Sequence, residues 1–460
     1  MAHENTATAS IQQLEDQLNS FDTTQRTNAL NELAGRVQSG SITLPREKRE
    51  VNLHFHTFFS YNANGWSPSR VAWEARKYGL AAAGIVDFDV LDGMEEFLSA
   101  GEVIGLRSTA ALETRVFIEE MSAYEMSSPN EPGIAYFMAG GCFQMPEAGS
   151  KSARIFQTMR EMARRRNVQV MELVNDHLDD VRLDYDADVL PLTPSGNATE
   201  RHMLAAYDAK SRQVFSDASE LASFWSRALA ISTDEATSLL ADEPKFHDKI
   251  RAKLMKFGGV GYVPPNSDTF PSIETVTDMI LGMEALPMIA WLDGTTSGEA
   301  DMPAFLGLLA SKGVVAMNII PDRNWNIKNP EEKKIKVENL AKAVKAAREI
   351  DFPLCVGTEM NKAGLPFVDD FNAPELAPYI DDFIEGADML WGHTFLARNF
   401  GIGYASKWAE SRFGDSRRKR NEFYARAGRA ACPITPANNL AGKNLAEASP
   451  EEVIRLLGEQ

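Results

Sequence analysis

From Val51 onward the sequence alternates short apolar runs, which are typical of β-strands, with longer stretches of helical periodicity. Helical stretches such as Pro68–Tyr78 and Glu331–Ile350 separate several of the runs. Alternating strands and helices indicate a parallel sheet, and seven or eight such units favour a closed barrel. The runs are Val51–His56, Ala82–Asp87, Ser108–Val116, Gly133–Met138, Leu286–Leu292, Val314–Ile320, Pro353–Glu359 and Ala387–His393.

Polar side chains end most of these predicted strands. In barrels of parallel strands, reactive side chains collect at the C-terminal ends of the strands. We therefore expect these residues to meet at one mouth of the barrel: His54, His56, Asp87, Glu113, Asp293, Asp322, Glu359 and His393.

Two histidines end the first strand, in the segment Asn52-Leu53-His54-Phe55-His56. Side chains at positions i and i+2 of a strand point to the same face, so His54 and His56 leave the strand side by side. Two imidazoles in that arrangement suit one borderline metal ion. The alternative is a polar network in the barrel mouth, with the imidazoles bonded to carboxylates.

The strand rhythm stops between about residues 151 and 257, where the sequence is largely helical, beginning with Ser152–Leu178. We interpret this part as an insertion between two barrel units, and the polar helices before Val51 as an N-terminal extension. The predicted organisation is a helical extension (1–48), a first barrel part (49–176), a helical insertion (177–257), a second barrel part (258–405) and a C-terminal tail (406–460).

Charge and composition narrow the classes of partner. The formal net charge is −18 and the pI is about 5.0, whereas binders of nucleic-acid polymers and membrane surfaces normally carry a basic face. We therefore expect the protein to bind neither a nucleic-acid polymer nor a membrane, but a small-molecule substrate. An anionic substrate would need a local positive site on this acidic protein. The N-terminus lacks a signal-peptide pattern and the three cysteines are well separated, which predicts a cytoplasmic protein.

Three segments of the barrel resemble the first motifs of the PHP (polymerase and histidinol phosphatase) superfamily: NLHFHTFFS, AAGIVDFD and AALETRVF. VGTEMN stands where that family usually ends a strand with Gly-Ser-Asp-x-His. The insertion, including TERHMLAAY, is similar to the helical insert of the PHP nucleotide phosphatases. The resemblance covers about residues 50–365. It implies a distorted TIM-like barrel of the (β/α)7 type that holds up to three metal ions for phosphoester hydrolysis.

Carried over residue by residue, the resemblance keeps the ligand set of one ion. His54, His56 and Glu113 match family ligands, and Glu359 replaces the family's aspartate. Four positions where the pattern has a histidine carry other residues, namely Phe88, Tyr136, Trp291 and Asn361. Phe and Trp cannot ligate a divalent ion. One transition-metal ion per chain (zinc, manganese or iron) is therefore expected, with a second one left open and three disfavoured.

Four further residues are candidates for the chemistry. Asp87 matches the aspartate of the second motif and is expected to bind the ion or to orient its water; otherwise it is a helix-capping or loop residue. His393 is a candidate acid/base or ligand, with a structural role as the alternative. Arg323 is expected to bind an anionic group, or to pair with Asp322 on the surface. Asn361 is a candidate substrate-binding residue.

Together these features predict a metal-dependent hydrolase. The expected reaction is phosphoester hydrolysis on a small phosphorylated or nucleotide-like substrate. Two alternatives remain at this stage. One is a non-catalytic barrel that binds a ligand, and the other is a single-metal hydrolase or lyase acting on a substrate without phosphate, for which aromatic residues such as Phe88 would line an apolar pocket.

Overall fold

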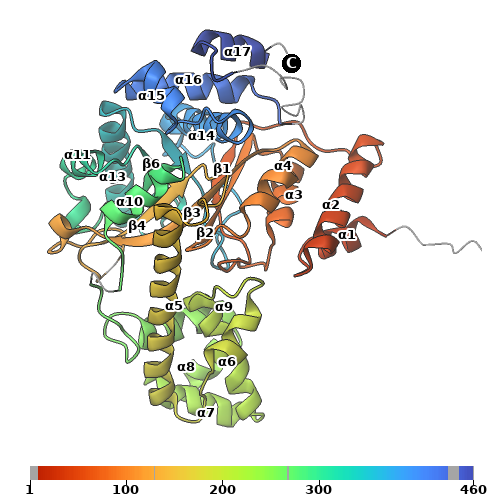
Figure 1. The fold of residues 1–460 in the computed structure, drawn as a ribbon. Helices are drawn as coiled ribbons and strands as arrows, with labels where there is room; N and C mark the ends of the chain where they lie inside the picture. Colours follow the sequence, from red (N-terminus) through yellow and green to blue (C-terminus); the bar gives the residue numbers. More distant parts are fainter. Residues whose placement is uncertain (1–8, 129, 267–268, 434–444, 459–460) are drawn as a thin grey trace, which may run out of the picture.

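A computed structural model describes residues 9–128, 130–266, 269–433 and 445–458. In this part of the chain, one sheet of seven strands follows the sequence order and forms a nearly closed, distorted TIM-like barrel (Figure 1). The strands are β1 (Val51–Phe55), β2 (Ala82–Phe88), β3 (Arg107–Phe117), β4 (Ile134–Gly140), β5 (Leu286–Trp291), β6 (Ala316–Ile319) and β7 (Leu354–Val356). Seven of the eight predicted strands are thus confirmed.

The expectation of a wholly parallel sheet is wrong at β4, which runs antiparallel to both β3 and β5. The other neighbouring strands are parallel. A parallel pair needs a crossover connection, usually a helix, to return the chain to the same end of the sheet. The link from β3 to β4 contains only the short 3-10 helix η1 (Glu119–Met121), so the chain turns back directly. Register pairs Tyr136 with Arg115, near the C-terminal end of β3.

The barrel closes between β1 and the residues that follow β7. The Glu359 amide donates to the His54 carbonyl at 2.8 Å, and the His56 amide donates to the Glu359 carbonyl at 2.8 Å. Gly357 makes this approach possible, because a Cβ at that position would lie 2.3 Å from the Cβ of His54. The backbone of Glu359 is therefore part of the barrel wall.

Helices pack around the barrel and at its ends. Those of the first half include α3 (Pro68–Tyr78) and α4 (Met94–Ile104), against which the N-terminal pair α1 (Ile11–Gln17) and α2 (Thr23–Gln38) lies (Figure 1). The later ones are α10 (Ile273–Gly282), α11 (Met302–Ser311), α12 (Asp322–Trp325), α13 (Pro330–Glu349), α14 (Ile380–Phe400), α15 (Lys407–Phe413), α16 (Arg417–Ala430) and α17 (Pro450–Gly458). None of the described helices is long and apolar enough to cross a membrane.

The eighth predicted strand, Ala387–His393, is wrong, because these residues lie inside helix α14. Every residue from Gly386 to Ala397 is buried, since α14 contacts several barrel strands and α16. An apolar run that is buried on all sides shows neither the helical nor the strand period, so the sequence pattern did not separate the two.

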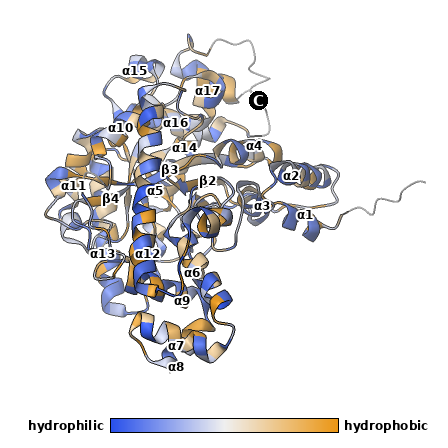
Figure 2. Ribbon diagram, turned by 60° about the horizontal axis from the view of Figure 1, so that its bottom comes forward, coloured by the Kyte–Doolittle hydropathy of each residue, from blue (hydrophilic) through white to orange (hydrophobic). Residues whose placement is uncertain are grey.

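The insertion forms its own hydrophobic core. Helix α5 (Lys151–Leu178) begins against the barrel, where Phe156 and Met159 belong to the barrel core, and ends in a second core that starts at Val170 and extends to Val263. In Figure 1 α5 runs from the barrel into a separate lobe, and in Figure 2 the lobe's helices carry both hydrophilic and hydrophobic residues. The lobe contains η2 (Tyr185–Val189), η3 (Leu190–Leu192), α6 (Glu200–Val214), α7 (Ala218–Leu229), α8 (Thr233–Leu240), α9 (Glu243–Ile250) and η4 (Arg251–Met255).

The second core begins within α5, at Val170, whereas the predicted insertion begins at residue 177. Contacts place the lobe at the C-terminal ends of the strands. Asn197 Nδ2 donates to the Phe88 carbonyl at 3.0 Å, and Lys362 pairs with Asp248 at 2.6 Å. Residues 1–8 of the predicted extension, and 434–444 and 459–460 of the predicted tail, lie outside the described residues.

Candidate functional site

Three predicted ligands come together at the C-terminal ends of β1 and β3. Glu113 Oε2 lies 3.7 Å from His54 Nε2 and 3.5 Å from His56 Nε2. All three residues are buried, and one donor atom of each lies within 4.8 Å of the others. His54 and His56 leave the end of β1 on the same side, as the alternation along a strand requires.

These donor atoms fit a metal ion. His54 Nε2, His56 Nε2 and Glu113 Oε2 are buried, and none of them has a hydrogen-bond partner in the structure. Buried polar atoms are normally paired, and a cluster of unpaired ones needs an explanation. Two imidazole nitrogens and a carboxylate oxygen are ligands that zinc, manganese and iron all accept. The group can therefore hold one divalent ion, a role in which each orphaned atom gains a partner.

The hydrogen bonds behind His56 fix its tautomer. Ser60 Oγ donates its only proton to Asp87 Oδ1 at 2.5 Å, so it must accept the hydrogen bond from His56 Nδ1 at 2.9 Å. His56 therefore carries a proton on Nδ1, and Nε2, which faces Glu113, is the nitrogen that is unprotonated in the neutral ring. This is the form in which a neutral histidine binds a metal.

Asp87 is the anchor of this chain of hydrogen bonds. Its carboxylate also accepts from the Thr57 amide at 2.8 Å and from Thr57 Oγ1 at 2.7 Å. Burial raises the pKa of Asp87, and the charge of His56 and these donors oppose that rise. The predicted role of Asp87 was to bind or orient water, but it does not line the cavity. The structure places it behind His56, where it orients a ligand.

His54 is held from the opposite side by Asn318 on β6. Asn318 Nδ2 lies 3.1 Å from His54 Nδ1, while Asn318 Oδ1 is buried without a partner. Turning this amide by 180° would satisfy Oδ1 with a proton on Nδ1, leaving Nε2 free to ligate. Burial opposes ionisation of Glu113, but the two imidazoles outweigh it and lower the pKa of Glu113 to about 2.

Glu359, the fourth predicted ligand, is not a member of the three-residue group. Its Oε2 accepts a hydrogen bond from Arg323 Nη2 at 3.0 Å. Glu359 still lies close enough to His54 to help raise the pKa of that imidazole, against the effect of burial. Arg323 thus pairs with Glu359, not with Asp322 as the surface alternative supposed.

His393 lies far from the predicted mouth, which contradicts its expected position. In α14 its Nε2 donates to the Gly141 carbonyl at 2.9 Å, and its Nδ1 accepts from the Tyr404 amide at 2.9 Å. Gly141 follows the end of β4, and because β4 is antiparallel this is the opposite end of the barrel from the mouth. Burial lowers the pKa of His393 to about 4. The residue is a neutral structural bridge.

A cavity of about 500 Å³ lies between the barrel mouth and the insertion. Ser60, Phe88 and Glu359 line it, and each of them also touches the His-His-Glu group or acts on it electrostatically. Phe88 stacks on His56 with ring centroids 4.7 Å apart. The His-His-Glu group therefore lies just beneath the floor of the cavity.

Three of the four positions where the family pattern has a histidine, Phe88, Tyr136 and Asn361, line this cavity. Trp291, the fourth, is fully buried and does not. Phe88 and Tyr136 thus place aromatic rings in the cavity lining where the family pattern has metal-binding imidazoles.

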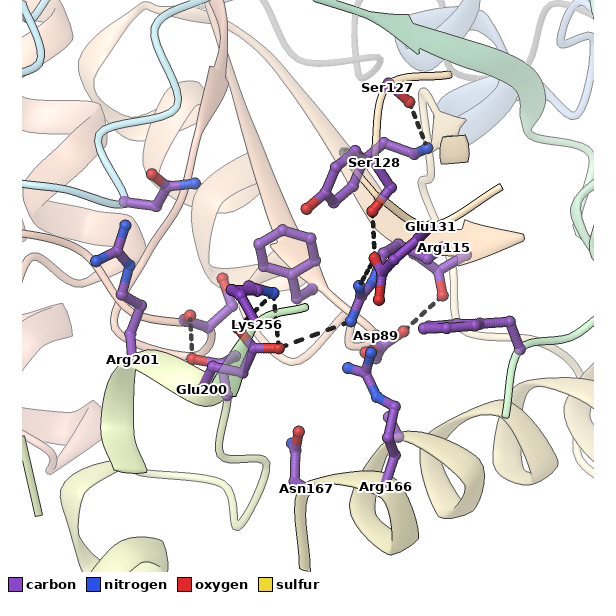
Figure 3. A pocket seen from close by; sticks show the side chains of 18 of the residues that line it. Asp89, Arg115, Ser127, Ser128, Glu131, Arg166, Asn167, Glu200, Arg201 and Lys256 are labelled. Carbon is purple, nitrogen blue, oxygen red and sulfur yellow. Dashed lines mark hydrogen bonds and ion pairs between the residues drawn. The ribbon is translucent and has the colours of Figure 1, made fainter. Parts of the chain in front are cut away.

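Basic side chains dominate the charged lining of the cavity, in a chain of net charge −18. Glu200, at the start of α6, forms ion pairs with Lys256 at 2.9 Å and Arg115 at 3.9 Å (Figure 3). It forms a third ion pair with Arg251 at 3.0 Å. Among the described residues, the lining has four carboxylates, Asp89, Glu131, Glu200 and Glu359, and six cations, Arg115, Arg166, Arg201, Arg251, Lys256 and Arg323.

Two groups of the lining have pKa values shifted toward neutral pH. Burial lowers the pKa of Lys256 to about 8, although Glu200 opposes this. Burial raises the pKa of Asp89 to about 6, against a 2.7 Å hydrogen bond from Thr114. The excess of cations in a partly enclosed space favours an anionic ligand.

Several of these residues were not predicted from the sequence. Ser60 stands in the NLHFHTFFS motif, four residues after His56, and that spacing was its available signal. Arg115 follows Glu113 by two residues and so shares its face of β3. Arg251, Lys256 and Glu200 carry no local signal, because they meet Arg115 only through the placement of the insertion.

No protein-family model and no curated protein sequence matches this chain. Among solved structures, it is similar to a protein assigned as a metal-dependent phosphoesterase from Bifidobacterium adolescentis. That likeness has 17% identity and a TM-score of 0.45, and covers 74% of this chain and 98% of the other. It is also similar to an amidohydrolase from Chromobacterium violaceum, solved with sulfate and no metal, at 14% identity and a TM-score of 0.47, covering 72% and 96% of the two chains.

Proposed function

We propose that this protein is a metal-dependent hydrolase of the PHP superfamily, most specifically a phosphoesterase that acts on a small phosphorylated or nucleotide-like substrate. The observation that carries the proposal is the cluster of unpartnered donor atoms on His54, His56 and Glu113 beneath a cation-rich cavity. The motifs of the barrel and its helical insertion supply the superfamily assignment.

In this proposal His54, His56 and Glu113 hold one divalent ion. Such an ion supplies Lewis-acid activation of water and of a phosphoryl oxygen. Asp87, acting through Ser60, keeps the proton of His56 on Nδ1 so that Nε2 stays available. The ligand geometry is therefore set before the substrate arrives.

Arg323 and the cations of the insertion bind and orient the substrate. Arg323 presents its guanidinium at the cavity floor beside Glu359, where it can receive an anionic group. Arg251 and Lys256, at the end of the insertion, add positive charge to the lining of the same cavity. The insertion covers the mouth and limits the access of bulk water, which strengthens each of these charge interactions.

The test is elemental analysis of the purified protein, followed by a substrate panel of phosphomonoesters, nucleotides, amides and lactones. We expect about one equivalent of zinc, manganese or iron, turnover of phosphoesters that a chelator abolishes, and loss of both in His56→Ala. Turnover confined to amides or lactones would overturn the phosphoesterase assignment. Protein that binds no transition metal would favour a non-catalytic barrel.

A further inference from the structure

The carboxylate of Glu359 and the guanidinium of Arg323 form an ion pair at the cavity floor, with Nη2 and Oε2 3.0 Å apart. The Glu359 side chain is 9% exposed and the Arg323 side chain 43% exposed. The acidic partner is thus enclosed in the barrel wall, while the basic partner keeps a free edge toward the cavity. A guanidinium has five donors, so a hydrogen bond to Glu359 leaves others for a ligand.

The direction of the Glu359 side chain is set by its backbone. Glu359 and Met360 both adopt left-handed conformations, with φ of 64° and 51°, which non-glycine residues rarely occupy. The backbone hydrogen bonds of Glu359 to His54 on β1 and to His56, just after β1, hold this strained turn in place. Strain of this kind persists only where the surrounding structure enforces it, and it gathers at functional sites.

The helix that carries Arg323 is also anchored. In α12, Asn324 Nδ2 donates to the carbonyls of Leu292 at 2.8 Å and Ile320 at 3.1 Å. Trp325 Nε1 donates to Asp369 Oδ1 at 3.1 Å. Both ends of the ion pair therefore sit on fixed backbone, and the guanidinium is held in one place.

Glu359 differs in this respect from the three ligand residues. Their donor atoms are unpartnered and lie within 4.8 Å of one another, whereas the Glu359 carboxylate is paired and lies outside that group. A carboxylate that already shares its charge with an arginine is a poorer metal ligand than a free one. The four predicted metal ligands thus fall into two sets: His54, His56 and Glu113 form the candidate metal group, and Glu359 pairs with an arginine.

We infer that Glu359 is a positioning residue that holds Arg323 at the cavity floor to bind the anionic group of the substrate, and that it is not the fourth metal ligand. This inference rests on the proposed function, because it assumes a metal at His54, His56 and Glu113 and an anionic substrate. In this arrangement the Arg323 guanidinium supplies positive charge at a place where the family pattern leads us to expect further metal ions.

The first arm of the test measures metal content. Wild type, Glu359→Gln and Glu113→Gln are purified in parallel, and bound transition metal is counted by elemental analysis. We expect Glu359→Gln to retain the wild-type stoichiometry and Glu113→Gln to lose most of its metal. Loss of metal from both variants would overturn the inference and leave the proposed function intact. Wild type without metal would overturn both.

The second arm measures the affinity for inorganic phosphate by calorimetry, in wild type, Glu359→Asp, Arg323→Met and the double variant. Glu359→Asp keeps the charge but withdraws the carboxylate by one methylene, so it acts on the anion only by releasing Arg323. We expect about a tenfold weaker Kd in Glu359→Asp, and less than about a twofold change when the same substitution is made in Arg323→Met. Equal effects in both backgrounds would refute the positioning role.

Arg323→Met gives the test a second variant, because the Arg323 side chain is 43% exposed, although its loss leaves the Glu359 carboxylate without this partner. If Glu359→Asp proves unstable, Glu359→Gln from the first arm replaces it in both backgrounds, and Arg323→Met tests the binding of the anion by Arg323. It should weaken phosphate binding at least about tenfold with unchanged metal content. Unchanged phosphate affinity in Arg323→Met would overturn the inference.

Discussion

Ser60 offers a sharp test of the site, because its hydroxyl links the Asp87 carboxylate to His56 without touching the proposed ion. In Ser60→Ala the 2.5 Å hydrogen bond to Asp87 and the 2.9 Å hydrogen bond from His56 Nδ1 are both lost. Ser60 is 1% exposed, so water does not readily replace the hydroxyl. The His56 ring then has no partner that fixes the proton on Nδ1.

The magnitude follows from these two contacts. A hydrogen bond to a charged group contributes about 1.5–3 kcal/mol, and leaving a buried donor unpaired costs about 1–3 kcal/mol. Asp87 keeps both hydrogen bonds from Thr57, which limits the loss, so we expect the free energy of unfolding to fall by roughly 2–4 kcal/mol. Loss of an outer partner of a metal-binding histidine lowers metal affinity by about 10–100-fold.

Metal affinity is measured by competition with a coloured chelator, and stability by denaturant unfolding with and without metal. Ser406→Ala is a matched control, because Ser406 is 4% exposed, donates to the Gly403 carbonyl at 2.6 Å and accepts from the Ala409 amide at 3.3 Å. The control should lose stability but keep its metal. Wild-type metal affinity in Ser60→Ala would refute the tautomer argument.

Three further outcomes follow from the structure. His54→Ala should reduce bound metal from about one equivalent to near zero by elemental analysis, with little change in far-UV circular dichroism. His393→Ala should lower the free energy of unfolding by about 3–5 kcal/mol in denaturant titrations, because the Gly141 carbonyl and the Tyr404 amide lose a buried partner; its metal content should not change. The pKa of Lys256 lies near 8, so its charge is lost as pH rises through that value. Phosphate affinity, measured by calorimetry from pH 6 to 10, should fall over that range in wild type, and less steeply in Lys256→Gln.

The barrel was predictable because its strands are short apolar runs that end in polar residues. What the runs do not encode is direction. The segment Gly133–Met138 looks like its neighbours in the sequence. It runs antiparallel because the link before it contains the three-residue helix η1 and not the longer helix that usually forms a parallel crossover. Helix α14 was misread for a related reason, since burial on every side removes the periodic pattern on which the reading depends.

The metal group was partly predictable, because His54 and His56 share a strand face and Glu113 ends another strand. The separation of Glu359 from this group was not. It depends on Arg323, whose approach is set by a short helix after β6 and by a left-handed turn after β7. Contacts between residues far apart in the chain carry no local signature, and the same holds for Arg251 and Lys256.

The acidic composition predicts that an anionic ligand needs a local positive site, such as metal ions, and the structure offers a second source of positive charge. At physiological salt, charges separated by more than about 8 Å are largely screened. The acidic outer surface therefore has little effect on a group inside the cavity, where the lining that the structure describes contains six cations and four carboxylates. Three of those cations, Arg201, Arg251 and Lys256, come from the insertion or its return to the barrel. The insertion thus contributes positively charged side chains to the cavity lining, and these favour the binding of an anion.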